Sequence, residues 1–230
     1  MKKIGIIGGL SAESTIEYYK ILLEEYNKLK GGSSSPSLII DSLDLEMFRN
    51  WMENNEWEEI VNAIINSAKI LEKGGAELII IATNTIHKIY DEVSKAISVP
   101  MISIMDATAE AIKLKKMRKV GLLGTIFTMQ SDFFHIAFLK HNLEIIVPKH
   151  KDQEIINQII WNELVHHILK PESKKEYVDI IKRLEYRGAE GVILGCTEIP
   201  LLIKENDSPI PVFDTTTLHA LAALKYALKD

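Results

Sequence analysis

An internal repeat is the sequence feature that most constrains the fold of this chain. Three pairs of segments match in the same order, at offsets of 116, 113 and 111 residues. The pairs are Lys3–Gly9 with Lys119–Thr125, Gly75–Thr83 with Gly188–Cys196, and Val99–Pro100 ahead of Asp106 with Ile210–Pro211 ahead of Asp214. Any two α/β halves share apolar strands and glycines, so the first pair alone carries little weight. The common order of all three predicts a duplicated unit in which each half starts with the same strand.

Short apolar, β-branched runs alternate with amphipathic stretches along the whole sequence, which is the pattern of an α/β protein. The stretch from Trp57 to Leu71 places its apolar residues on one helical face, and the glycines at 74 and 75 predict where that helix ends. Glu77–Ala82 is typical of a strand buried on both faces, as in a parallel sheet. We therefore expect an N-terminal half formed by residues 1–98 and 210–230, and a central half formed by residues 99–209.

Composition limits the classes of function. The chain has 230 residues and carries 27 Lys and Arg against 32 Asp and Glu, a net charge of −5. It has no block of five or more basic residues, which argues against nucleic acid as a partner. Its apolar runs are far shorter than the roughly 20 residues of a membrane helix, and glycines interrupt the first apolar stretch. We therefore expect no membrane association and a cytoplasmic location.

Cys196 is the only cysteine, which excludes an intrachain disulfide and a zinc site built on several thiolates. The seven histidines show no metal-binding spacing, so we expect no catalytic metal. The sequence also lacks a P-loop and a Gly-x-Ser-x-Gly string, which argues against P-loop phosphoryl transfer and serine hydrolysis of that kind.

The repeat gives Thr83 and Cys196 equivalent positions, each eight residues after the glycine of a Gly-Ala-Glu string and at the end of a predicted strand. Parallel sheets bind ligands beyond the carboxyl ends of their strands. Two facing halves would present both side chains to one crevice, where they could flank a small ligand as opposed proton carriers.

The residues after Cys196 are Thr197, Glu198 and, two residues further on, Pro200, a pattern that is typical of a helix start. Because a helix N-terminus favours an anion, we expect the thiol pKa to fall from about 8.5 toward neutrality. The thiolate could then act as a nucleophile or as a general base. A buried structural cysteine is the alternative, but the repeat position and the polar neighbours favour a functional one.

Two further segments suit an anionic ligand. Thr83–Thr85 would expose backbone donors at a helix start, and the Gly8-Gly9-Leu10-Ser11 segment offers a similar cradle after the first strand. Thr125 is the counterpart of Gly9 and could add a hydroxyl. A plain helix cap is the competing explanation for both segments.

Arg49 lies just after the second predicted strand and could bind a carboxylate through its forked guanidinium group. An ordinary surface arginine is the competing explanation.

Taken together, the motifs resemble those of the cofactor-independent aspartate/glutamate racemase superfamily over nearly the full chain. The matching segments are Ile6–Gly9 with Glu13–Thr15, Thr83–His87, Leu123–Thr125, Gly191–Glu198 and Pro211–Asp214. The Gly-Cys-Thr-Glu string at residues 195–198 is the most specific of them. The resemblance implies an α/β fold of two pseudo-symmetric Rossmann-like parallel-sheet halves with the active site between them. It also implies racemisation by two opposed acid/base residues without pyridoxal phosphate or another cofactor, and a homodimer.

Thr83 stands where the family typically has its first catalytic cysteine, so the chain resembles a branch of these racemases that carries threonine there. Cys196 matches the second catalytic cysteine. By the same resemblance, the α-carboxylate of the substrate is bound by residues at 84, 85 and 197, and the distal carboxylate by Arg49. A lysine that assists Arg49 in some members is missing from residues 164–167. The expected substrate-binding residues are Leu10, Ser11, Arg49, Asn84, Thr85, Thr125, Thr197 and Glu198.

The sequence therefore predicts an isomerase, an aspartate racemase that interconverts L- and D-aspartate, with glutamate as a second candidate substrate. Cys196 would remove the α-proton from one enantiomer, and Thr83 would reprotonate the opposite face. Two alternatives stay open: a cofactor-independent decarboxylase or other isomerase of the same superfamily, and a non-catalytic dicarboxylate-binding protein.

Overall fold

The computed structural model describes residues 1–229, which divide into two compact units. Unit 1 comprises residues 1–104 and the chain from residue 216 onward, and unit 2 comprises residues 105–215. The boundaries expected from the sequence lie six residues earlier in both places. Strand pairing explains the difference, because Met101 forms a parallel bridge with Ile79 of unit 1, whereas Val212–Asp214 pair with a strand of unit 2.

Unit 1 contains a three-stranded parallel sheet in the order β2-β1-β3. Its elements are β1 (Ile4–Gly8), α1 (Ala12–Lys30), β2 (Leu38–Ser42), α2 (Leu45–Glu53), α3 (Trp57–Lys73), β3 (Leu78–Ile81), the 3₁₀ helix η1 (Thr85–Ile89), α4 (Tyr90–Lys95) and α11 (Thr215–Ala227). Every residue of β1 and β3 is buried, as expected for parallel strands that are covered on both faces.

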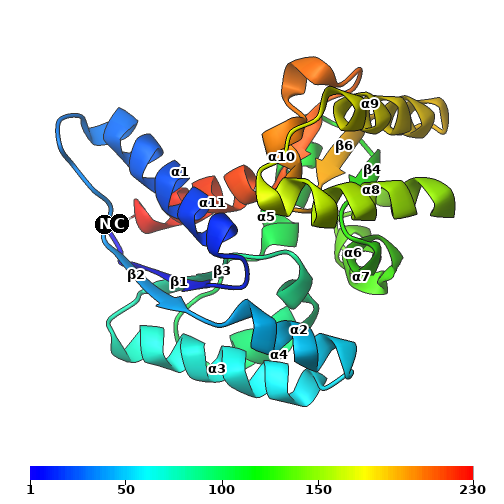
Figure 1. Cartoon of the computed structure of the whole chain (residues 1–230). Helices are drawn as coiled ribbons and strands as arrows, with labels where there is room; N and C mark the ends of the chain where they lie inside the picture. Colours follow the sequence, from blue (N-terminus) through cyan, green and yellow to red (C-terminus); the bar gives the residue numbers. More distant parts are fainter. Residues whose placement is uncertain (230) are drawn as a thin grey trace. The chain divides into compact units, whose positions relative to one another are not determined.

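Helices cover the two faces of this sheet (Figure 1). Tyr18 and Leu22 of α1 pack with Ala223 of α11 on one face. Ile60 and Ile64 of α3 pack on the other face. The helix predicted from Trp57 onward is therefore present, and its apolar stripe forms the core contact.

Unit 2 contains a four-stranded parallel sheet in the order β5-β4-β6-β7. Its elements are α5 (Ile104–Leu114), β4 (Lys119–Leu123), α6 (Ile126–Gln130), α7 (Asp132–Leu139), β5 (Glu144–Ile146), α8 (His150–Asn162), η2 (Leu164–His166), α9 (Pro171–Tyr186), β6 (Gly191–Leu194), α10 (Ile199–Leu202), η3 (Glu205–Asp207) and β7 (Val212–Asp214). The α/β fold with two parallel-sheet halves is the one predicted from the sequence.

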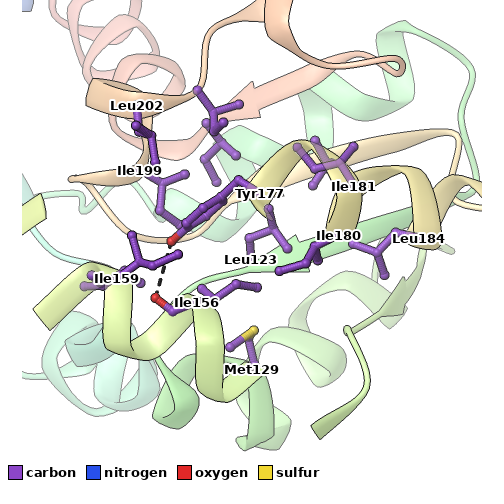
Figure 2. Close-up of a cluster of buried hydrophobic side chains, with 14 of the residues drawn as sticks. Leu123, Met129, Ile156, Ile159, Tyr177, Ile180, Ile181, Leu184, Ile199 and Leu202 are labelled. Carbon is purple, nitrogen blue, oxygen red and sulfur yellow. Dashed lines mark hydrogen bonds between the residues drawn. The ribbon is translucent and has the colours of Figure 1, made fainter. Parts of the chain in front are cut away.

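An apolar cluster on one face of the unit 2 sheet joins α8 and α9 to β4 and β6, and Tyr177 of α9 lies within it (Figure 2). The Tyr177 hydroxyl donates a hydrogen bond to the Ile156 carbonyl oxygen at 3.4 Å. Ile199 and Leu202 of α10 belong to the same cluster, and Cys196 packs against it. The core of unit 2 thus extends up to the candidate cysteine.

The two sheets have the same register at positions that the repeat makes equivalent. Ile4 lies opposite Leu78 in unit 1, and their counterparts Val120 and Gly191 lie opposite each other in unit 2. The predicted correspondence of the repeated strands is therefore confirmed at the level of individual residue pairs.

Even the side-chain contacts of the Gly-Ala-Glu strings are repeated. The Glu77 carboxylate accepts the backbone N–H of Lys3 at 2.8 Å, and the Glu190 carboxylate accepts that of Lys119 at 2.9 Å. Each glutamate thus fixes the start of the first strand in its own half, which explains why the string occurs twice.

The third segment pair is also equivalent, but only up to the prolines. The Pro100 carbonyl accepts the Ile79 N–H at 2.9 Å, and the Pro211 carbonyl accepts the Val192 N–H at 2.8 Å. Beyond this point the halves differ, since residue 214 ends a strand whereas Asp106 lies within a helix.

None of the helices within residues 1–229 combines the length and the apolar character that a membrane crossing requires.

Candidate active site

In each unit the candidate residues follow the carboxyl ends of adjacent strands. In unit 1, Ser11 follows β1, Arg49 lies beyond β2 and Thr83 follows β3. In unit 2, Thr125 follows β4 and Cys196 follows the neighbouring β6. Because strands in a parallel sheet all end at one edge, each unit collects its own candidates at one edge of its sheet.

The segment after β1 is engaged in starting α1. The Ser11 hydroxyl accepts the Ser14 N–H at 3.2 Å, and the Gly9 N–H donates to the Thr15 hydroxyl at 2.9 Å. Gly9 has a φ of 77°, and a Cβ there would collide with the Leu43 backbone, so only glycine fits. Leu10 is buried in the core of unit 1. In the predicted anion-binding segment, the Gly9 N–H therefore already donates to a side chain of the protein itself.

Residues Thr83–Thr85 form the turn that joins β3 to η1. The Thr83 N–H donates to the Ile81 carbonyl at 2.9 Å, and the Thr83 carbonyl lies 2.8 Å from Nδ1 of His87. The side chain of Asn84 is buried, whereas Thr83 and Thr85 are only half-buried. The turn therefore holds its backbone firmly while two hydroxyl side chains keep some exposure.

Arg49 lies on an exposed face of α2 and pairs within its own helix. Its Nε is 3.1 Å from the Glu53 carboxylate, and one of its terminal nitrogens is 3.7 Å from the Glu46 carboxylate. The hydrogen bond with Glu53 raises the pKa of the guanidinium group, which stays charged. Exposed ion pairs of this kind are weak, so a carboxylate ligand can displace them.

Cys196 and Glu198 form a direct hydrogen-bonded pair. The thiol donates to Oε2 of Glu198 at 2.9 Å, and the Thr197 hydroxyl donates to the same oxygen at 2.9 Å. Glu198 is buried, with 7% of its surface exposed, whereas Cys196 and Thr197 are half-buried. The carboxylate is thus positioned to accept the proton of the thiol.

The expected low thiol pKa is wrong. Burial, followed by the charge of Glu198 and the hydrogen bond to it, raises the pKa of Cys196 well above its usual range. The predicted helix start is also short, since α10 begins at Ile199 and has only four residues. A single helical turn supplies little dipole, so burial and the neighbouring carboxylate decide the outcome and Cys196 is a neutral thiol at neutral pH.

Two residues beside this pair escaped the sequence analysis. Burial raises the pKa of Tyr177 well above its usual range, and the negatively charged forms of Cys196, Glu163 and Glu198 act in the same direction. Glu163 itself accepts a hydrogen bond from the Ser173 hydroxyl at 2.5 Å. Tyr177 lies on an ordinary amphipathic helix, and only its packing position relates it to the thiol.

Thr125 acts as the N-cap of α6. Its hydroxyl accepts the Thr128 N–H at 3.3 Å and lies 3.2 Å from the Thr128 hydroxyl. The competing explanation of a helix cap therefore describes the geometry of Thr125, as it does that of Ser11.

His, Cys, Asp and Glu side chains within residues 1–229 form no group of three or more that could hold a metal ion. Glu198 has the thiol and the hydroxyl of its own loop as its partners instead.

Comparison with known proteins identifies the family. The family described as Asp/Glu/Hydantoin racemase matches residues 7–223, which includes both Thr83 and Cys196. The chain belongs to the Asp/Glu/hydantoin racemase family.

The relatives of this racemase-family chain include amino-acid racemases. It is 28% identical over 224 residues to the broad specificity amino-acid racemase RacX of Bacillus subtilis, with 94% of each chain covered. It is 44% identical to a solved aspartate racemase homologue from Pyrococcus horikoshii, over the whole of both chains and with a TM-score of 0.89. It is 26% identical to the solved aspartate racemase of Picrophilus torridus, with 100% and 96% of the chains covered and a TM-score of 0.75. Family membership indicates an isomerase that acts on amino acids.

Proposed function

We propose that this racemase interconverts L- and D-aspartate by moving the α-proton between Cys196 on one face of the α-carbon and Thr83 on the other. The observation that carries the proposal is the hydrogen bond from the Cys196 thiol to the buried Glu198 carboxylate. It gives the thiol a proton acceptor, which a neutral thiol needs before it can act as a base.

The proposed proton path begins at Cys196 and finishes at Thr83. The Cys196 proton passes to Glu198, and the resulting thiolate removes the α-proton of one enantiomer. A high thiol pKa makes the thiolate scarce but strongly basic, which suits the weakly acidic α-carbon. On the other face, a Thr83 hydroxyl, alone or through a bound water, gives a proton to the carbanion and is reprotonated by solvent. Glu198 returns to solvent the proton that it took from Cys196, which restores the starting state.

The carbanion shares its charge with the α-carboxylate, so groups that bind this carboxylate stabilise the intermediate. We assign this role to Asn84, Thr85 and Thr197. The Thr197 hydroxyl donates to Glu198 in the structure, so it must rotate when substrate binds. Its release would also remove one hydrogen bond from the Glu198 carboxylate and make that carboxylate a better acceptor for the thiol proton.

Aspartate is the preferred substrate in this proposal because Arg49 supplies a forked cation for a distal carboxylate. The aspartate racemase homologue with 44% identity supports this choice. The broad specificity of RacX is the competing possibility, and the exposed, displaceable ion pairs of Arg49 are compatible with it.

The decisive experiment incubates the purified protein with L- and then D-aspartate in deuterated water, without added pyridoxal phosphate. Nuclear magnetic resonance follows loss of the α-proton, and chiral analysis follows the configuration of the product. Exchange with inversion supports the racemase. If aspartate and glutamate are both inert, release of carbon dioxide from a disubstituted malonate would instead support a decarboxylase, and tight aspartate binding without exchange would support a binding protein.

Substrate preference has a test of its own. Arg49→Met should raise the KM for aspartate by about tenfold, because the distal carboxylate loses its forked cation. The matched control is Arg118→Met, which removes a cation that does not belong to the candidate residues beyond the strand ends of either unit. An unchanged KM for aspartate in Arg49→Met would remove Arg49 from the site.

A further inference from the structure

His87 is buried four residues after Thr83, with 2% of its surface exposed. Its Nδ1 lies 2.8 Å from the Thr83 carbonyl oxygen, and its Nε2 lies 3.1 Å from the backbone nitrogen of Ile104. The ring therefore connects the Thr83 turn with the segment through which the chain leaves unit 1.

These two partners define one protonation state of the ring. A carbonyl oxygen only accepts, so Nδ1 must carry the proton, and a backbone N–H only donates, so Nε2 must be bare. The neutral Nδ1–H form of His87 is the one state that satisfies both contacts. Burial, together with the nearby His219, lowers the pKa of His87 to about 3, in agreement with a neutral ring.

A second buried histidine supports the first. The rings of His219 and His87 meet edge to face with centroids 5.4 Å apart, and Tyr90 stacks on His87 at 5.8 Å. His219 lies 2.8 Å from the Ile102 carbonyl through Nε2 and 2.7 Å from the Tyr18 hydroxyl through Nδ1. By the same reasoning, His219 carries its proton on Nε2, so the two rings have opposite tautomers.

The repeat indicates that His87 is not needed for the half-fold itself. The residue four positions after Cys196 is Pro200, which has no side-chain donor or acceptor, yet β6 keeps the register of β3. The histidine clamp is therefore particular to the half in which the strand ends at Thr83.

We propose that His87 is a positioning residue that fixes Thr83 for proton transfer through the hydrogen bond from Nδ1–H to the Thr83 carbonyl. This inference rests on the role given to Thr83 under the proposed function. Proton transfer requires the hydroxyl to lie close to the α-carbon in a defined position, and misplacement by about 1 Å can cost 100-fold in rate.

Two substitutions of His87 separate its two hydrogen bonds. In His87→Asn the amide nitrogen takes the place of Nδ1 and keeps the donor to Thr83, but the acceptor for Ile104 is lost. In His87→Gln the amide oxygen reaches the place of Nε2 and keeps the acceptor, but the donor to Thr83 is lost. His219→Asn is the matched control, because it removes the bond to Ile102 in the same cluster without touching Thr83.

The measurement uses the aspartate enantiomer that Cys196 deprotonates, in deuterated water. Deuterium with retained configuration reports Cys196, and deuterium with inverted configuration reports Thr83. We expect His87→Gln to lower the ratio of inversion to retention by about tenfold or more, whereas His87→Asn and His219→Asn stay close to the wild-type ratio.

The outcomes separate this inference from the proposed function. Wild-type protein without any exchange would overturn the proposed function, and the role of His87 with it. Wild-type exchange with the same ratio in all three variants would overturn the role of His87 alone, as would an equal fall in both His87 variants.

A variant that fails to fold does not block the test, because the tautomers can be read in the wild-type protein. Nitrogen-15 spectra of the histidine rings should show the proton of His87 on Nδ1 and that of His219 on Nε2. A proton on Nε2 of His87 would leave the Thr83 carbonyl without its donor and would overturn the inference.

Discussion

The ends of β3 and β6 occupy equivalent places in the two units, but the groups beyond them have opposite chemical character. The Thr83 turn is held by His87, a neutral base whose ring is buried. The Cys196 thiol instead faces the Glu198 carboxylate and lies near Tyr177. The comparison teaches that the repeat preserved the scaffold, whereas the residues just after each strand and the helices behind them determined the chemistry.

This difference should give the two units opposite responses to pH. Unit 1 buries histidines that stay neutral well below their ordinary pKa, whereas unit 2 buries a thiol and a phenol that stay protonated above theirs. Unit 1 should therefore lose stability in acid, and unit 2 should lose stability in alkali as the unfolded chain deprotonates its cysteine and tyrosine.

The largest effect is expected from removal of the Cys196 thiol. Cys196→Ala should reduce racemisation and exchange on the Cys196 face by about 1,000-fold or more, because the thiolate is the proposed base on that face. Exchange of the α-proton in deuterated water measures this for each enantiomer. Full activity in Cys196→Ala would end the case for two-base transfer.

Acid unfolding tests the buried bases of unit 1. Burial lowers the pKa of His87 to about 3 and that of His219 to about 4, below the value of about 6.5 in an unfolded chain. Between pH 6.5 and 4 the unfolded chain binds more protons, so stability is complete above pH 6.5 and falls as the pH falls. Each histidine should remove up to about 1.4 kcal/mol of unfolding free energy per pH unit in this window.

Urea unfolding at a series of pH values measures that slope. The slope should flatten in the double variant His87→Asn, His219→Asn and should keep its wild-type value in His150→Gln, since the side chain of His150 is largely exposed. An unchanged slope in the double variant would mean that the two rings do not control acid stability.

Removing the carboxylate of Glu198 tests its pairing with the Cys196 thiol. Glu198→Gln should lower kcat by about 10- to 100-fold, because the thiol loses its proton acceptor. The same change should lower the pKa of Cys196, since the carboxylate is one of the causes that raise it. The ultraviolet absorbance of the thiolate against pH measures this shift. Glu185→Gln, on the exposed side of α9, is the control, and an unchanged thiol pKa in Glu198→Gln would contradict the pairing.

The smallest effect is expected from a substitution that places a thiol at the ends of both β3 and β6. Thr83→Cys should keep racemase activity within about tenfold of wild type, because a thiol is a competent acid on the same face. The rates for L- and D-aspartate should become more equal, since both faces would then carry the same group. Initial rates from each enantiomer measure this ratio, and a complete loss of activity would show that the hydroxyl itself is required.

Much of the fold could be predicted because it depends on local pattern. The apolar run at Leu78–Ile81 and the amphipathic stretch at Trp57–Lys73 form the predicted strand and helix. The boundaries between the two units were harder to predict from the sequence. Residues near 101 and 212 belong to one unit or the other because they pair with strands that are distant in sequence.

The candidate residues divide in the same way. Spacing in the repeat placed Thr83 and Cys196 at equivalent strand ends, but it could not give the protonation state of the thiol. A helix start at Pro200 suggested a low thiol pKa. Burial of the thiol reversed that direction, and the Glu198 carboxylate, 2.9 Å away, adds to the effect.

The sequence by itself determined the alternation of strands and helices, the duplication and the equivalent positions of Thr83 and Cys196. These features are periodic or local, and apolar patterning and glycine placement encode them directly. Only the tertiary structure decided that His87 is a neutral clamp on the Thr83 turn and that Cys196 shares a proton acceptor with Thr197. Those properties depend on burial and on distances of about 3 Å between groups, and no spacing along a chain specifies them.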